Sequence, residues 1–320
     1  MSFAHSSNHK AMASYRNGNL EVIDCECCGY RHLWPIPSEK EVRETYERRF
    51  GGSIRSHFVE KKREDAEHWQ RVFQRRLGQI REHRGQKPGR ILDVGCGVGD
   101  YLAFMSGQGW EVYGIEPSDS FHGELAQRSV PVLPKLVEDI SDDDWSQLGQ
   151  FDVINMSQFL EHVRDPRAIL SAVEKALRPA GLLVIECPND FNEFQLAAVV
   201  SQDIPMWWIS PLHINYFDFE ALERLCRSVG CEPVGRSTQF PLEMFLHFGD
   251  VYVGNAELGR EVHKKRMAFE DSLTRSGHGK ALEDLYDALA GCGLGRHATV
   301  VARKQPGVAG VVTETGDDYD

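Results

Sequence analysis

Three glycines at alternate positions follow an apolar, strand-like run and form the part of the chain best suited to hold a ligand. The run RILDVGCGVG covers residues 90–99. Glycine lets a backbone turn sharply and approach a ligand without a Cβ clash. The positions of this turn that we expect to contact a ligand are Asp93, Gly95, Cys96, Gly97 and Gly99. The next apolar run ends in Glu116, whose carboxylate can accept hydrogen bonds from both hydroxyls of a ribose.

The spacing of these glycines argues against a dinucleotide-binding turn, the nearest alternative. Such a turn has the pattern G-x-G-x-x-G. Here the third glycine comes one residue early, and Asp100 stands where that pattern requires glycine. The turn therefore departs from the dinucleotide pattern.

Composition and charge narrow the classes of protein that need to be considered. The 320 residues are 41% apolar and 26% charged, which is ordinary for a folded protein. A net charge of −12 disfavours nucleic acid as a partner, because phosphate neutralisation needs clustered Lys and Arg. No run approaches the ~20 apolar residues of a membrane span, and the N-terminus lacks the apolar core of a secretory signal. We therefore expect a cytoplasmic protein that does not bind membranes, and an oligomer is compatible with the sequence.

Alternating strand-like and helix-like runs over residues 89–240 predict an α/β fold with a doubly wound, Rossmann-like sheet. Strands are expected at 90–94, 111–116, 130–133, 151–156, 181–187 and 232–239, with a last core strand in 296–304. The other segments are additions to this core. They are a Cys/His-rich, ribbon-like segment at 1–37, a charged helical lid at 38–88, a helical insertion and substrate lid at 241–295, and a disordered tail at 305–320.

Further motifs extend the pattern beyond the glycine turn. They are IEPS at 115–118, FDVINMSQFLEHVRDPRAIL at 151–170, RPAGLLVIECPND at 178–190, and LHINYFDFEALERLCRSVGCEPV at 212–234. As a set, these resemble the motifs of the class I S-adenosylmethionine (SAM)-dependent methyltransferases over roughly residues 88–240. The resemblance implies SAM as cofactor and methyl transfer as the reaction.

The resemblance also assigns roles to individual residues. It implies that Asp93 orients either the glycine turn or the cofactor's amino group. It places Glu116 at the ribose and Asp139 at the adenine amine. Asp139 is equally consistent with a solvated loop acid, because acids cluster from 138 to 144. The residues that the resemblance places beside the methyl group are Met156, Ser157 and Gln158.

Two histidines could remove a proton from the methyl acceptor, because His titrates near neutral pH. His162 lies in the L-E-H-V run after the fourth core strand, and His213 follows the fifth. We favour His213 as the base and His162 as a brace, although either histidine could hold its loop instead. Tyr216 either lines the acceptor site or packs in the interior.

A zinc site is one of two interpretations of the N-terminal segment. Cys25 and Cys28 have the C-x2-C spacing of half a zinc ribbon, but no second C-x2-C precedes them. His5 and His9 stand in its place and could complete a structural zinc site, with His32 as a further candidate. The other interpretation is a degenerate ribbon without metal.

The function that we expect is SAM-dependent methyl transfer to a small-molecule acceptor, such as a sugar, a nucleotide-sugar or a phosphonate intermediate of biosynthesis. The phosphate options rest on a basic run at 263–266 that could bind an anionic acceptor. Two alternatives are a protein or RNA methyltransferase and a non-catalytic SAM-binding regulatory module. An enclosed acceptor pocket favours the small molecule, and a basic stripe favours RNA.

Overall fold

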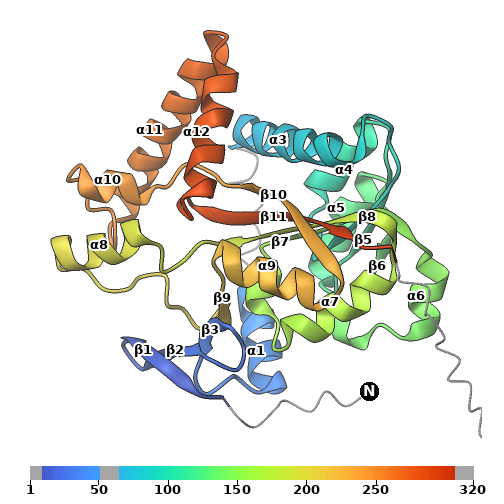
Figure 1. The fold of residues 1–320 in the computed structure, drawn as a ribbon, viewed down its shortest axis with the longest axis horizontal. Coiled ribbons are helices and arrows are strands. Elements are labelled where there is room, and N and C mark those ends of the chain that lie inside the picture. The colour runs from blue at the N-terminus through green and yellow to red at the C-terminus, as the bar shows by residue number, and fades with distance from the viewer. Residues whose placement is uncertain (1–8, 51–64, 307–320) are drawn as a thin grey trace, which may run out of the picture.

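A seven-stranded sheet forms the centre of the protein (Figure 1). The computed structural model describes residues 9–50 and 65–306, so His5 and most of the expected tail lie outside the described residues. The strands are β4 (Arg90–Val94), β5 (Glu111–Ile115), β6 (Val132–Leu133), β7 (Phe151–Ser157), β8 (Leu177–Pro188), β10 (Cys231–Ser237) and β11 (His297–Lys304). Their order is β10-β11-β8-β7-β4-β5-β6, and only β11 runs antiparallel to its neighbours. The predicted doubly wound sheet is confirmed.

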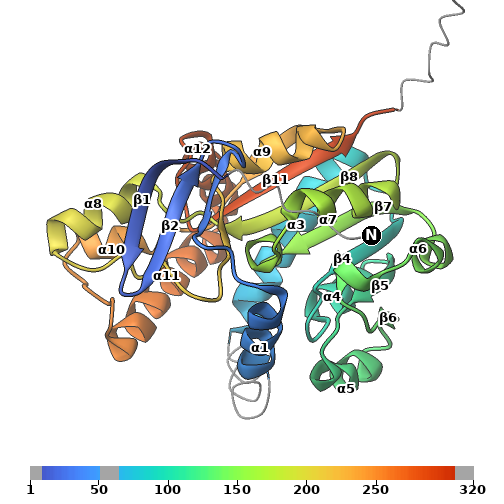
Figure 2. The same cartoon turned by 90° about the horizontal axis from the view of Figure 1, so that it is seen from below.

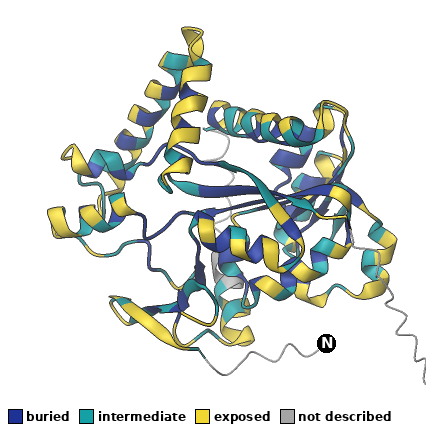
Figure 3. Ribbon diagram, viewed as in Figure 1, coloured by how far each residue is buried: buried dark blue, intermediate teal, exposed yellow. Residues whose placement is uncertain are grey.

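Helices cover both faces of this sheet (Figures 1 and 3). One face packs under α3 (Ala66–Arg84), α4 (Asp100–Gly107) and α5 (Asp119–Gln127), and the other under α7 (Pro166–Lys175) and α9 (Phe219–Ser228). The central strand β8 is apolar over Leu182–Ile185 and has no exposed surface there, as expected for a strand buried on both faces. Helix α9 begins where the Asp218 carboxylate accepts the Ala221 N–H at 2.8 Å.

The chain leaves the middle of the sheet in opposite directions at β4 and β7, which are hydrogen-bonded neighbours. Ligands of doubly wound sheets bind in the crevice outside the carboxyl ends of such strands. Here the glycine turn follows β4, and a 3-10 helix, η2 (Leu160–His162), follows β7. Both predicted halves of the site are therefore at one edge of the sheet.

A separate four-stranded antiparallel sheet lies beside the core (Figure 2). Its strands are β1 (Ala11–Asn17), β2 (Leu20–Cys25), β3 (Tyr30–Leu33) and β9 (Asn215–Tyr216). Three come from the N-terminal segment, and the fourth comes from the segment that follows His213. Side chains on both partners, including Val22, Leu33, Trp208 and Tyr216, form one buried cluster. The ribbon-like extension is thus paired directly with the loop expected to face the acceptor.

Four helices extend the far end of the molecule (Figure 1). They are α8 (Glu193–Gln202), α10 (Glu243–His247), α11 (Ala256–Arg275) and α12 (Gly279–Gly291). The last three lie between β10 and β11, where the sequence predicts an insertion. None of the described helices is both long enough and apolar enough to cross a membrane.

Candidate active site

A cavity of about 1520 Å³ opens at the carboxyl ends of β4, β5 and β7. Pockets for one small ligand are typically about 300–1,000 Å³, so this cavity has room for a cofactor and a second molecule. Its wall combines the glycine turn with Glu116, His162 and His213. Helix α1 (Glu39–Phe50) and α3 complete the wall with Val42 and Phe73, among others.

The glycine turn separates a position that faces the cavity from one that packs inside. Gly97 has φ +54, and a Cβ atom there would have no neighbour within 4 Å, so the backbone is open to a ligand. A Cβ on Gly99 would lie 2.6 Å from Leu125 Cδ2. The sequence suggested that Gly99 contacts the ligand, but Gly99 does not line the cavity. Instead, it lets α4 start close against α5.

Glu116 is held at the cavity wall by the glycine turn itself. Its carboxylate accepts the N–H of Gly97 at 3.0 Å and the N–H of Ser118 at 2.9 Å. These bonds fix both oxygens at the end of β5. The residue is only 2% exposed. The open cradle at Gly97 beside this carboxylate fits a ribose and its attached amino-acid tail, as the resemblance implies.

Asp93 is the second-last residue of β4 and is buried beside the neighbouring strand. Asn155 on β7 donates from its side-chain amide to the Asp93 carboxylate at 2.6 Å. Both residues line the cavity, so Asp93 is placed where it can orient the turn or contact the cofactor's amino group.

Asp139 also lines the cavity, in the 3-10 helix η1 (Val137–Asp139). Its half-exposed carboxylate is 3.4 Å from Arg43 of α1, which also pairs with Glu39 at 3.0 Å. Helix α1 thus closes over the region expected to hold adenine.

The end of β7 presents alternate residues to the cavity, because successive side chains of a strand point to opposite faces. Asn155 and Ser157 line it, and Gln158 follows. Met156 is completely buried in the core instead, which corrects the expectation that it lies beside the methyl group.

An ion pair that the sequence did not indicate fixes Arg76, one of the residues of this wall. Arg76 of α3 and Glu186 of β8 are both nearly inaccessible and 2.7 Å apart. Burial raises the pKa of Glu186, but Arg76, together with His297 and the Ser157 hydroxyl, outweighs burial and lowers the pKa to about 2. The same carboxylate accepts the Ser157 hydroxyl at 2.8 Å and so fixes that side chain at the cavity.

The two predicted histidines meet in the cavity wall, with ring centroids 5.2 Å apart. His162 donates its Nδ1–H to the Leu212 carbonyl at 2.6 Å. His213 Nδ1 is 3.8 Å from the buried Asp190 carboxylate, within ion-pair range but longer than a hydrogen bond. Glu161 lies beside both rings, and burial raises its pKa to about 7 although His213 lowers it in part.

Tyr216 packs in the interior, which is one of the two roles that the sequence allowed. Its ring is 2% exposed, and its hydroxyl donates to the Ser210 carbonyl at 3.3 Å and accepts the Ser210 N–H at 3.2 Å. The residue closes the 210–216 loop on itself and is not among those that line the cavity.

Among the described residues, two groups of side chains have the composition of a metal site, and in each the ligand atoms lie within 4.8 Å of one another. One is Glu161, His162 and His213 in the cavity. The other is His9, Cys25, Cys28 and His32 in the N-terminal sheet. The second group contains three of the four predicted zinc ligands, and His32 takes the place given to His5.

The insertion at 241–295 is less closely connected to the cavity than the sequence suggested. Among the described residues, none from this segment lines it. The basic run on α11 is already neutralised: His263 contacts Asp65, Lys264 contacts Glu261, and Lys265 contacts Asp250.

Comparison with known proteins agrees with this fold. A family model described as a methyltransferase domain matches residues 61–235, more than half of the chain. A solved magnesium protoporphyrin IX methyltransferase from Synechocystis PCC 6803 with bound SAH has a TM-score of 0.52 at 10% identity. That match covers 82% of this chain and all of the other, and it supports the fold.

Curated relatives are about 30% identical to this chain over the part that aligns with them. The ubiquinone biosynthesis O-methyltransferase of Bordetella bronchiseptica is 30% identical over 170 residues, which are 50% of this chain and 69% of the relative. The protein of the same name from Idiomarina loihiensis is 30% identical over 141 residues, 42% of this chain and 57% of the relative. The chain belongs to the class I SAM-dependent methyltransferase family.

Proposed function

We propose that this protein transfers a methyl group from SAM to a hydroxyl group of an uncharged small molecule. The observation that carries this proposal is the single cavity that joins the Glu116 end, suited to a nucleoside, to the pair His162 and His213. The curated relatives named as O-methyltransferases support a hydroxyl acceptor.

The cofactor half of the cavity would hold SAM through Glu116, Asp93 and the backbone at Gly97. Glu116 would accept the ribose hydroxyls while its bonds to Gly97 and Ser118 keep it in place. When bound, SAM supplies an electrophilic methyl group on a positively charged sulfur. The protein's main contribution to such a displacement is to align the acceptor with that methyl group.

The acceptor half would position the hydroxyl near His213. As the new bond to oxygen forms, His213 accepts the hydroxyl proton and becomes an imidazolium. The Asp190 carboxylate, 3.8 Å away, stabilises that charge and is itself held by Gln195 at 2.9 Å. His162 has its Nδ1–H committed to Leu212 and acts as a positioning residue.

An uncharged acceptor is favoured because the described cations of the cavity wall already have partners. Arg43 pairs with two acids, Arg76 with Glu186, and Lys135 with Asp144. Arg164 donates to the Pro37 carbonyl at 2.9 Å. A phosphate or phosphonate would have to displace one of these contacts, so the nucleotide-sugar and phosphonate options lose their structural support.

The test is a panel of acceptors incubated with SAM, with SAH release and product mass as readouts. The panel includes neutral phenols and sugars, nucleotide-sugars and phosphonates. We expect O-methylation of a neutral member and a lower rate for its phosphorylated counterpart. Methylation confined to protein or RNA, or a strict need for a phosphate on the acceptor, would overturn the proposal.

A further inference from the structure

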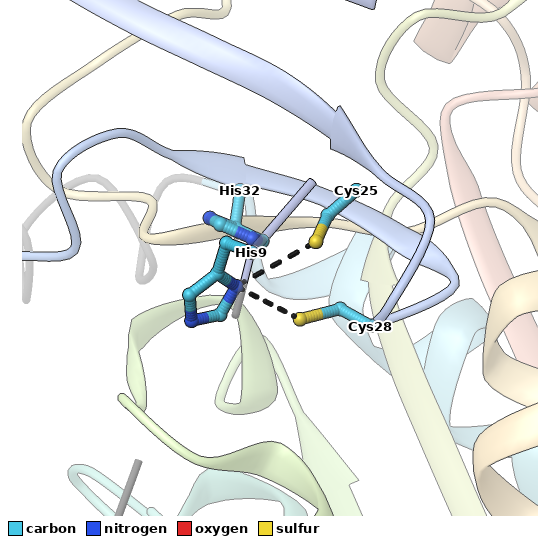
Figure 4. A group of neighbouring side chains, drawn as sticks. All are labelled: His9, Cys25, Cys28 and His32. Carbon is cyan, nitrogen blue, oxygen red and sulfur yellow. Dashed lines mark hydrogen bonds between the residues drawn. The ribbon is translucent and has the colours of Figure 1, made fainter. Parts of the chain in front are cut away.

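Four side chains of the N-terminal segment converge beside its sheet (Figure 4). His9 precedes β1, Cys25 ends β2, Cys28 lies in the following turn, and His32 lies on β3. We propose that these residues form a structural zinc site and that the bound ion holds β3, the strand that supports the loop of His213. The zinc site itself does not depend on the proposed reaction.

Distances at His9 match those between ligands of one zinc ion. Its Nδ1 atom is 3.5 Å from Cys25 Sγ and 3.4 Å from Cys28 Sγ. Tetrahedral zinc, with Zn–N about 2.0–2.1 Å and Zn–S about 2.3 Å, places nitrogen and sulfur ligands roughly 3.5 Å apart. A ring nitrogen has one proton or one lone pair, so it cannot make full hydrogen bonds to both sulfurs. A shared cation accounts for both distances at once.

His32 is prepared as the fourth ligand. It is fully buried, and its Nδ1–H donates to the Leu33 carbonyl at 2.9 Å. One ring nitrogen of His32 lies within 4.8 Å of the other three ligand atoms, and with Nδ1 bonded to the carbonyl the zinc ligand would be Nε2. Zinc-binding histidines typically donate their second ring N–H to a carbonyl or carboxylate in this way, which fixes the ring orientation.

The backbone positions the remaining ligands before any ion binds. Gly29, at φ +74, turns the chain after the cysteines and donates its N–H to the Cys25 carbonyl at 2.9 Å. Glu26 donates its N–H to the Lys10 carbonyl at 2.9 Å, and the two side chains pair at 2.6 Å. These contacts hold the segment with His9 against the cysteine turn.

Four protein ligands leave no open position, so the site is of the structural kind. Its consequence for the cavity follows from the hydrogen bonds of β3. His32 pairs in register with Asn215 of β9, and the Leu33 N–H donates to the Ile214 carbonyl at 2.8 Å. Ile214 in turn donates to the Glu161 carbonyl at 2.7 Å. The ion would therefore stabilise the strand pairing on which the position of His213 depends.

The test measures metal content of the full chain, purified with reduced thiols, incubated with zinc and desalted. We expect about one zinc per chain in the wild type. Cys28→Ser and His32→Ala should each lose it. The matched controls are Cys27→Ser, an exposed cysteine outside the group, and His5→Ala, the ligand that the sequence favoured; both should keep it.

Cobalt substitution gives a second readout that needs no variant to fold. Wild type loaded with Co²⁺ should show the absorption of a tetrahedral site together with thiolate-to-cobalt charge transfer. The proposal is overturned if neither metal is retained, if Cys25 and Cys28 are found as a disulfide, or if His5→Ala rather than His32→Ala abolishes binding.

Discussion

The Nδ1–H of His162 donates to the carbonyl of Leu212 at 2.6 Å, which joins the segment after β7 to the loop that carries His213. The two histidines therefore have different environments although their rings are neighbours. His162 is fixed by the backbone, whereas His213 faces the Asp190 carboxylate. This difference supports separate roles for them in the proposed reaction.

Replacing His213 by alanine should lower turnover by about 10²–10⁴, the usual contribution of a general base. SAM affinity, measured by calorimetry, should stay within error, because the residue lies at the acceptor end. His247→Ala, a histidine outside the cavity lining, is the control and should keep wild-type turnover. Normal turnover in His213→Ala would transfer the role to His162 or remove the need for a histidine base.

His162→Ala should lower the melting temperature as well as turnover, because it removes the bond to Leu212. The two readouts separate this positioning role from proton transfer. A variant with wild-type melting temperature and no turnover would instead make His162 the base.

Turnover should be independent of added Mg²⁺ or Mn²⁺ if Glu161, His162 and His213 serve proton transfer and do not bind a metal ion. The measurement is the initial rate against cation concentration, with zinc content checked to be unchanged. An absolute requirement for a divalent cation would contradict the base mechanism and indicate that these three groups bind a metal.

Arg76→Met should destabilise the protein strongly, because it leaves the Glu186 carboxylate buried without its partner. Removing one member of such a pair typically costs about 3–5 kcal/mol. Urea unfolding at neutral pH measures the loss. Arg275→Met removes an exposed pair with Glu67 and should change little. A similar small effect for Arg76→Met would show that Glu186 is compensated by other contacts.

His297, which is partly buried, should make the protein less stable in mild acid. Burial lowers its pKa from 6.5 to about 4. The unfolded chain therefore binds the extra proton first, and the free energy of unfolding falls as pH drops between these two values. Over the full window this group alone contributes roughly 2–4 kcal/mol.

The measurement for His297 is urea unfolding of wild type and His297→Gln at several pH values in this window. The variant should show a flatter pH dependence. Glu161 has a raised pKa and acts in the opposite direction, but it is present in both proteins, so the difference isolates His297. If the free energy of unfolding changes with pH by the same amount in both proteins, the lowered pKa of His297 is contradicted.

The sheet and the positions of Asp93 and Glu116 at the cavity could be predicted because local patterns determine them. Apolar runs bounded by glycine gave β4, β5 and β7 nearly to the residue, and Asp93 and Glu116 mark the strand ends. Met156 was expected beside the methyl group because of its position at the end of β7. Alternate side chains of a strand point to opposite faces, and that of Met156 packs in the core. Gly99 was misplaced for a related reason, since its use in packing α4 on α5 depends on Leu125, a distant residue.

Contacts between distant segments could not be read from sequence. Arg76 lies in a charged stretch that resembles a solvated helix, and only the fold brings it to Glu186. His32 became the candidate zinc ligand because β2 and β3 form a hairpin that returns it to Cys25. Asp190 was overlooked, although it ends the quoted C-P-N-D run after β8.

The central claim is that Glu116 and the glycine turn bind SAM, and calorimetric titration of SAM into wild type and Glu116→Ala tests it most directly. Charge-assisted hydrogen bonds of this kind are worth about 1.5–3 kcal/mol each. Glu111→Ala, an acid at the other end of β5, is the matched control. We predict binding by wild type and Glu111→Ala, and affinity reduced roughly tenfold or more in a folded Glu116→Ala. Equal affinity in all three proteins, or no binding by wild type, would contradict the account.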